Sequence, residues 1–308
     1  MSSGNHLFDP NSHVQIPLHW KRRDFVKGVT ALAGAAGLSA YDMRSAAAEP
    51  PPETTTLRIK QDPVLCEAPV AVAEQLLRAE GFSDVQYLQA HGAMADEKLA
   101  SGKMDLELEA AWYAVTRIEA GDPFVLLAGV HVGCFELIGH ERVRTIRDLK
   151  GKAVVVPRIG GTPYQLIVSM ATYVGLDPHR DIKWVVREGR EAMQFFIDGK
   201  ADAFMGFPPE PQELRARNIG HVVVNTTTDR PWSQYFCCMV MANRAFVREH
   251  PVATKRALRA LLKANEVCAT QPKTAARLMV ERGWTKNYNL ALSVVKEMPY
   301  GRSDLRAI

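Results

Sequence analysis

The sequence predicts an α/β protein that is built from two lobes. Short strand-like runs alternate with amphipathic helices, and this alternation is typical of largely parallel sheets. Once its first 48 residues are set aside, the 308-residue chain is still long for one simple core and suits two lobes. A Gly-Lys pair followed closely by Asp occurs at 102–105 and again at 199–202, which indicates that the two lobes are alike.

The first 48 residues have the features of an export leader. The basic stretch 21–27 precedes a weakly apolar run at 28–40, and the three alanines at 46–48 offer a signal-peptidase site. As a helix the apolar run would measure about 20 Å, too short for the ~30 Å hydrocarbon core of a membrane. Because Arg22 and Arg23 precede a Gly/Ala-rich run, residues 1–48 resemble a twin-arginine signal peptide. Residues 49–56, rich in Pro and Thr, are predicted to form a linker.

The predicted elements follow each other in a regular order. The first set comprises strands at 56–60, 84–88, 103–108 and 124–130, with helices at 69–80, 91–101 and 110–120. The second set comprises strands at 134–139, 153–156, 182–186 and 201–206, with helices at 163–174 and 189–198. Strands at 222–225 and 237–242 come next, and a long helix at 252–269 carries one apolar stripe.

Charge argues against nucleic acid as a partner. Removing the leader lowers the formal net charge from +4 to +2, because the leader holds five basic and three acidic residues. Such a small excess, spread along the chain, does not form the basic surface that nucleic acid requires. An anionic small molecule remains compatible with it.

The cysteines and acids form no recognisable catalytic or metal motif in the sequence. Cys66, Cys134, Cys237, Cys238 and Cys268 show neither C-x-x-C nor Cys/His spacing, so we expect buried thiols, no structural zinc and no other cofactor. Neither G-x-S-x-G nor H-E-x-x-H occurs, and no catalytic residue is predicted. Glu107 and Glu109 lie two apart on a strand and therefore point to one side, which alone is weak support for a site.

The segment 153–165 is the most informative about binding. A strand is followed by Gly160, Gly161 and Thr162, with Pro at the first position of a helix. The free amides and the dipole of a helix N-terminus attract anions, so these residues are candidate ligand contacts. Alternatively, Thr162 and Gln165 form a T-x-x-Q capping box that satisfies the same amides without a ligand. The glycines match neither a Walker motif nor G-x-G-x-x-G, which disfavours a nucleotide-binding fold.

Several motifs together resemble a known family. They are residues 148–152 before a strand and the glycine-Thr helix start, then 199–203, 246–251 and 271–276, in that order along 57–300. In this order they are similar to the solute-binding proteins of ABC importers, in the branch that takes sulfonates, nitrate, taurine and thiamine-pyrimidine precursors. Members of this branch usually extend further, so we expect part of the covering of the first lobe to be missing after Ile308.

The resemblance implies a two-lobed periplasmic binding protein of type II, with two crossovers between the lobes. Residues 57–130 plus 226–308 would form lobe 1, and 131–225 would form lobe 2. A small solute would be held in the cleft between them, and an ABC permease in the inner membrane would receive it. By position in the family, the residues lining the cleft would be Cys66, Glu67, Trp112, His131, Cys134, Gly160, Gly161, Thr162, Tyr164, Phe207 and Glu210.

Two other functions stay open on the sequence. Thiamine-pyrimidine synthases share the implied fold and use a cysteine-rich motif, at which only Cys237-Cys238 hints. An export leader does not suit such a biosynthetic enzyme, so we expect no enzymatic activity. A periplasmic subunit that senses a solute for a receptor is the second alternative. The twin-arginine translocase would be a partner during export, whether the protein serves an importer or a receptor.

Overall fold

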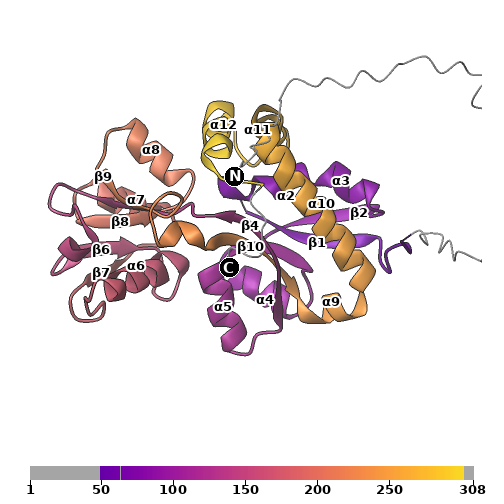
Figure 1. Ribbon diagram of the computed structural model, residues 1–308, viewed down its shortest axis with the longest axis horizontal. Helices are drawn as coiled ribbons and strands as arrows, with labels where there is room; N and C mark the ends of the chain where they lie inside the picture. The colour runs from indigo at the N-terminus through magenta and orange to yellow at the C-terminus, as the bar shows by residue number, and fades with distance from the viewer. Residues whose placement is uncertain (1–48, 63, 302–308) are drawn as a thin grey trace, which may run out of the picture. The chain divides into compact units, whose positions relative to one another are not determined.

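The computed structural model describes residues 49–62 and 64–301, and the predicted leader at 1–48 lies outside the described residues. Within those ranges, none of the helices combines the length and the hydrophobicity that a membrane crossing requires. Two five-stranded sheets organise the described chain (Figure 1). The predicted two-lobed α/β fold is confirmed, and each lobe is built on one sheet.

Lobe 1 contains the first sheet, whose strand order is β2-β1-β3-β10-β4. Its strands are β1 (Thr56–Gln61), β2 (Asp84–Gln89), β3 (Leu106–Ala110), β4 (Phe124–Val132) and β10 (Phe236–Asn243). Strands β1, β2 and β3 are parallel, whereas β10 runs antiparallel to both β3 and β4. The helices of this lobe are η1 (Leu65–Glu67), α2 (Ala68–Val72), α3 (Glu74–Ala79), α4 (Ala93–Ala100), α5 (Ala111–Glu119), α9 (Arg244–Glu249), α10 (Pro251–Thr270), α11 (Pro272–Glu281) and α12 (Tyr288–Glu297).

Lobe 2 contains the second sheet, with the order β7-β6-β8-β5-β9. Its strands are β5 (Glu136–Gly139), β6 (Ala153–Val156), β7 (Lys183–Val186), β8 (Ala203–Gly206) and β9 (His221–Asn225). Here β5 runs antiparallel to β8 and β9. The helices are η2 (Ile146–Leu149), α6 (Thr162–Tyr173), α7 (Arg190–Ile197) and α8 (Glu210–Ala216). The chain enters this lobe at 133–135 and leaves it at 226–235, which contains η3 (Trp232–Gln234).

The two lobes repeat one another in backbone detail. In lobe 1 the strand β10 lies beside β3, and in lobe 2 the strand β5 lies beside β8. Each of these two strands is the first that the chain forms after it arrives from the other lobe. Gly92 and Gly189 precede α4 and α7 with φ of 50° and 49° and ψ of −130° and −132°. The Oδ2 atom of Asp105 accepts from the N–H of Arg58 at 2.7 Å, and that of Asp202 accepts from Ala153 at 2.9 Å. The repeated Gly-Lys…Asp pattern therefore marks the same helix-to-strand turn in each lobe.

Sequence-based expectations differ from the structure at the start of several strands and within one helix. The strand expected at 103–108 begins only at Leu106, because residues 103 and 104 donate to the carbonyl of Lys98 and belong to the turn that ends α4. The single helix expected at 69–80 is divided at Ala73 into α2 and α3, with Ala73 N–H bonded to Val70 O at 3.3 Å in a tighter turn.

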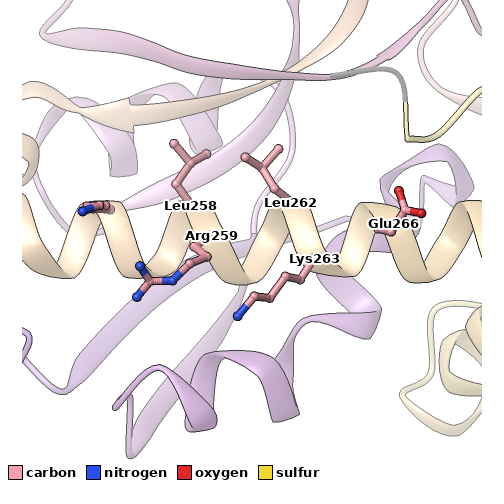
Figure 2. A pocket seen from close by; sticks show the side chains of 6 residues that line it. Leu258, Arg259, Leu262, Lys263 and Glu266 are labelled. Atoms are coloured by element: carbon pink, nitrogen blue, oxygen red, sulfur yellow. The ribbon is translucent and has the colours of Figure 1, made fainter. Parts of the chain in front are cut away.

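Helix α10 is fixed to lobe 1 by charged side chains on its outer flank. The Glu53 carboxylate, from the segment predicted as a linker, accepts from the amides of Val252 and Ala253 and caps the helix. Glu80, which follows α3, is buried and accepts from Arg259 at 2.5 and 2.9 Å and from Lys263 at 3.0 Å. Figure 2 shows Arg259 and Lys263 pointing to the same side of α10, within a pocket that this helix alone lines.

These contacts make Glu80 sensitive to acid. Hydrogen bonds from Arg259, and secondly from Lys263, outweigh burial and lower the pKa of Glu80 from 4.5 to about 2. A carboxyl whose pKa is lowered by folding stabilises the folded state above its unfolded pKa, and the stabilisation is lost as the pH falls towards the folded pKa.

We therefore expect Glu80→Gln to lower the free energy of unfolding at pH 7 by about 1–3 kcal/mol. The effect is moderate because the side chains of Arg259 and Lys263 are partly exposed to solvent. The difference from the unmodified protein should shrink steadily between pH 4.5 and pH 2. Urea unfolding followed by circular dichroism at several pH values measures both. Glu97→Gln, at an exposed position on α4, is the matched control and should change little. Equal stability of the two variants at pH 7 would contradict this account of Glu80.

Candidate functional site

The predicted site residues follow the carboxyl ends of the central parallel strands. Segments after β1 and β3 carry Cys66, Glu67 and Trp112, and segments after β6 and β8 carry Gly160 to Tyr164, Phe207 and Glu210. His131 lies at the end of β4, and Cys134 lies in the first crossover. In open α/β sheets ligands bind at these strand ends, where the direction of the connections switches.

A buried ammonium surrounded by three carboxylates lies at the end of β1. Lys60 is 4% exposed, and its Nζ donates to the carbonyl of Leu108 at 2.7 Å. Carboxylate oxygens of Glu67, Glu107 and Glu109 lie 3.3, 3.6 and 3.7 Å from the same Nζ. The alternation of β3 places Glu107 and Glu109 on one face, as expected, and η1 supplies Glu67.

One ammonium cannot balance three carboxylates, two of them buried and the third partly buried, so the protonation states in this cluster are shifted. Burial raises the pKa of Glu107 from 4.5 to about 8, with Lys60 opposing the rise, and it also raises the pKa values of Glu67 and Glu109. Burial disfavours the charge on Lys60, but attraction to Glu67, Glu109 and Glu107 outweighs it and holds the Lys60 pKa well above its usual value. At pH 7 Glu107 is therefore mostly a neutral acid.

Three of the predicted residues meet in a second cluster, next to the first. The ring of His131 and the thiols of Cys66 and Cys134 have ligating atoms within 4.8 Å of one another, and His131 forms an equally tight group with Cys237 and Cys238. All five side chains are buried and the thiols are free. Residue spacing in the sequence does not reveal this cluster, because the side chains come from four separate segments that only the fold brings together.

The helix start at Gly160, Gly161 and Thr162 can be interpreted from the sequence either as a ligand contact or as a capping box, and the structure excludes the capping box. The predicted capping box is absent: the N-cap of α6 is Gly161, no side chain caps it, and Thr162 already lies inside the helix. The Gln165 side-chain amide instead donates to Gly160 O at 2.9 Å and to Thr116 Oγ1, on α5, at 3.2 Å. Because the helix begins one residue earlier than expected, no side chain competes with a ligand for its first amides.

The same region brings the two lobes together. The guanidinium of Arg158, just after β6, lies 5.2 Å from the ring centre of Tyr113, on the first turn of α5. Tyr113 in turn donates to Asp96 at 2.5 Å, and its neighbour Trp112 is partly buried against a hydrophobic core that both lobes contribute to. The strand ends of β3 and β6 thus face each other across the lobes.

The remaining predicted residues lie within lobe 2. Tyr164 packs on Trp184 with ring centres 4.6 Å apart, and Phe207 packs on Phe135 of the first crossover at 5.5 Å. The Glu210 carboxylate lies 3.4 Å from the amide of Phe207, and burial raises its pKa to about 7. Glu210 is therefore partly neutral at pH 7.

Sequence reasoning missed Lys60, Cys237 and Cys238 as members of these clusters. Lys60 resembled an ordinary polar end of a strand, and the two cysteines resembled core residues of an apolar strand. A lysine inside a strand that is otherwise buried, together with the Glu107–Glu109 pair, was the available signal for the first cluster.

The chain is similar to known proteins in sequence pattern and in fold. A family model described as NMT1/THI5 like matches residues 70–275. No curated protein shows significant sequence similarity to the chain. Among solved structures, the aliphatic sulphonate binding protein SsuA from Escherichia coli is 19% identical with a TM-score of 0.67, over 80% of this chain and 84% of that one.

Two further structures share the fold at a similar level. The alkanesulfonate-binding protein SsuA from Xanthomonas axonopodis pv. citri, bound to MOPS, is 16% identical with a TM-score of 0.66, over 80% of this chain and 86% of that one. The periplasmic nitrate-binding protein NrtA from Synechocystis PCC 6803 has the same identity and TM-score, over 80% and 71%. The fold is thus that of periplasmic binding proteins.

Because the ammonium of Lys60 is buried among carboxylates, we expect its removal to lower the free energy of unfolding strongly and in a pH-dependent way. Lys60→Met leaves two buried carboxyl groups and one partly buried carboxyl group without a counter-charge, so we expect the free energy of unfolding at pH 8 to fall by about 3–5 kcal/mol. The loss should be smaller at pH 5, because carboxyl groups with raised pKa values take up protons in the folded state as the pH falls. Urea unfolding at both pH values tests this. Lys103→Met, at an exposed position, is the control, and a Lys60→Met variant no less stable than that control would refute the role of Lys60.

Proposed function

The chain belongs to the NMT1/THI5-like family, and on that premise we propose that it is the periplasmic solute-binding component of an ABC importer. It would capture a small polar or anionic solute between its lobes and release it to a permease in the inner membrane. The lobes would close by bending at the two crossovers, 133–135 and 226–235. No chemical turnover is part of this role.

One observation carries the proposal more than any other. The carboxyl ends of β3 and β6, which belong to different lobes, are brought face to face by the contacts of Arg158 with Tyr113 and of Gln165 with Thr116. A solute held between these ends would touch both lobes, which is the requirement for a ligand that stabilises a closed form. The sulfonate- and nitrate-binding proteins with the same fold support this use of the geometry.

The residues around α6 favour an anionic ligand. The uncapped N-terminus of α6 offers backbone amides and the positive end of the helix dipole, and the Arg158 guanidinium lies just before it. Glu67 is already paired with Lys60, and Glu210 is only partly ionised at pH 7, so neither is well suited to hold an amine. We therefore favour a sulfonate, nitrate or similar oxyanion over an amine or a pyrimidine.

Export would follow the twin-arginine route, because residues 1–48 resemble that type of signal peptide. The translocase of this route would be a transient partner.

The structural relatives named above are binding proteins, which favours binding over the alternative of a pyrimidine synthase.

A thermal-shift screen with alkanesulfonates, taurine, nitrate and pyrimidines tests the proposal. We expect an oxyanion to raise the melting temperature and Thr162→Trp to abolish that rise, because the indole would fill the space beside the first amides of α6. Thr172→Trp makes the same substitution at an exposed position near the other end of α6 and should keep the ligand response. The proposal would be abandoned if no solute shifted the unmodified protein, and the pocket would be misplaced if Thr162→Trp responded like Thr172→Trp.

A further inference from the structure

The cluster of Cys66, His131, Cys134, Cys237 and Cys238 has the composition of a metal site. The Sγ atoms of Cys66 and Cys134 form a compact triad with a ring nitrogen of His131, and those of Cys237 and Cys238 form another. The triads share His131 and meet where the Cys134 and Cys237 sulfurs lie 3.2 Å apart. Exposure of the five residues is between 0% and 6%, so water is nearly excluded.

His131 is oriented as a ligand would be. Its Nδ1 lies 3.1 Å from the carbonyl of Gly133 and 3.3 Å from that of Val132, and since carbonyls only accept, Nδ1 carries the proton. In the neutral ring the lone pair lies on Nε2, which is buried and has no hydrogen-bond partner within ordinary geometric limits. Metal-bound histidines are held in the same way, with the other ring nitrogen donating to a carbonyl. This nitrogen lies beside the thiols of the cluster, with Cys238 as an immediate neighbour, which is the setting of a metal-ligating histidine.

The backbone departs from regular geometry in order to bring the thiols together. Consecutive strand residues point to opposite faces, but β10 carries a bulge at Cys237: Phe236 pairs with Val132 and Cys238 with the adjacent residue His131. The bulge allows neighbouring cysteines to reach one cluster. It also sets Cys238 directly opposite His131.

The first crossover contributes Cys134, whose backbone conformation is also unusual. Cys134 has a φ of 136°, which non-glycine residues rarely adopt. Gly133, just before it, has a φ of 59°, and a Cβ there would lie 2.3 Å from the backbone of Thr227. The buried hydroxyl of Thr226 holds this conformation, because it accepts from the amides of Cys134 and Phe135 at 3.2 and 3.0 Å. Strain that is held so firmly is typical of functional positions.

We propose that this cluster binds one thiophilic metal ion of the Zn²⁺ class, through His131 Nε2, Cys66, Cys134 and a thiol of the Cys237–Cys238 pair. Thiolate and imidazole donors in a tetrahedral set suit Zn²⁺ and related soft ions. On binding, the ion displaces the thiol protons into solvent. The site is closed on all sides by protein, with Tyr300 edge-on to His131 at 5.5 Å and its hydroxyl bonded to Cys66 O, so the ion would be resident rather than cargo.

A disulfide between Cys134 and Cys237 is the competing use of the same atoms. It would employ two of the thiols and leave Cys66, Cys238 and the Nε2 atom of His131 without a role. A metal ion employs the histidine and thiols from every segment of the cluster. The geometry therefore favours the metal, and the two cases differ in a measurable way.

The test uses the full chain, purified with a reductant and a chelator and then titrated with Zn²⁺ or Co²⁺. We expect one tightly held Zn²⁺ per chain by elemental analysis after desalting, and a Co²⁺ spectrum with thiolate charge-transfer and tetrahedral ligand-field bands. Cys134→Ser and His131→Gln should weaken the affinity for Zn²⁺ more than about 100-fold, since even outer partners of such ligands contribute 10–100-fold. Bound Zn²⁺ should also protect the cluster thiols, but not Cys268, from alkylation in the partly unfolded protein.

Cys268→Ser is the matched control, because Cys268 is a buried, free thiol on α10 that belongs to neither triad. The spectrum of the unmodified protein with Co²⁺ does not depend on any variant folding. The proposal is wrong if the reduced protein binds no stoichiometric metal, if Cys268→Ser loses as much affinity as Cys134→Ser, or if mass spectrometry finds a Cys134–Cys237 disulfide in a protein that binds no metal once reduced. These measurements use no solute, so their outcome is separate from that of the solute screen.

Discussion

The position of β10 is the constraint on which the rest of the structure depends. This strand comes late in the chain and yet lies between β3 and β4, antiparallel to both. It joins the carbonyls and amides of two strands that would otherwise be sheet edges. Asn243, at its end, accepts from Phe246 and donates to Leu99 O, so the same strand fixes the start of α9 and the end of α4. The second crossover must end at its first residue.

Because β10 begins at the crossovers, both unusual clusters gather around its first residues. Cys237 and Cys238 enter the sulfur cluster from this strand, and Cys238 pairs with Ala110, one residue after Glu109. Cys238 also adds to the rise in the pKa values of Glu67 and Glu109. The ammonium of Lys60 is the near counter-charge for the carboxylates, and Cys238 is the thiol that interacts with two of them. Electrostatics couples the two clusters, and a cation in the second would reduce the excess of negative charge shared by both.

Sequence patterns predicted the elements far better than the side-chain clusters. Alternating and helical periodicities depend on residues close in the chain, so strands such as β6 and helices such as α10 were predicted almost to the residue. The sulfur cluster depends on four segments that lie far apart in the chain and on a bulge at Cys237, and neither leaves a local pattern in the sequence. The capping box failed for a related reason: Gln165 bonds to Thr116, a residue of the other lobe. Contacts that tertiary structure creates overrode a motif that sequence alone made plausible.

The backbone repeat between the lobes has a consequence for how such a chain arises. Each lobe receives its antiparallel inner strand, β10 or β5, directly from the other lobe, and the matching conformations of Gly92 and Gly189 show the same unit on both sides. This is the arrangement of a symmetric dimer in which two identical subunits exchange one strand, with the subunits joined into a single polypeptide. Joining them frees the copies to diverge. The two lobes differ accordingly: buried thiols and charges gather where lobe 1 meets the crossovers, and lobe 2 has the uncapped helix start of α6.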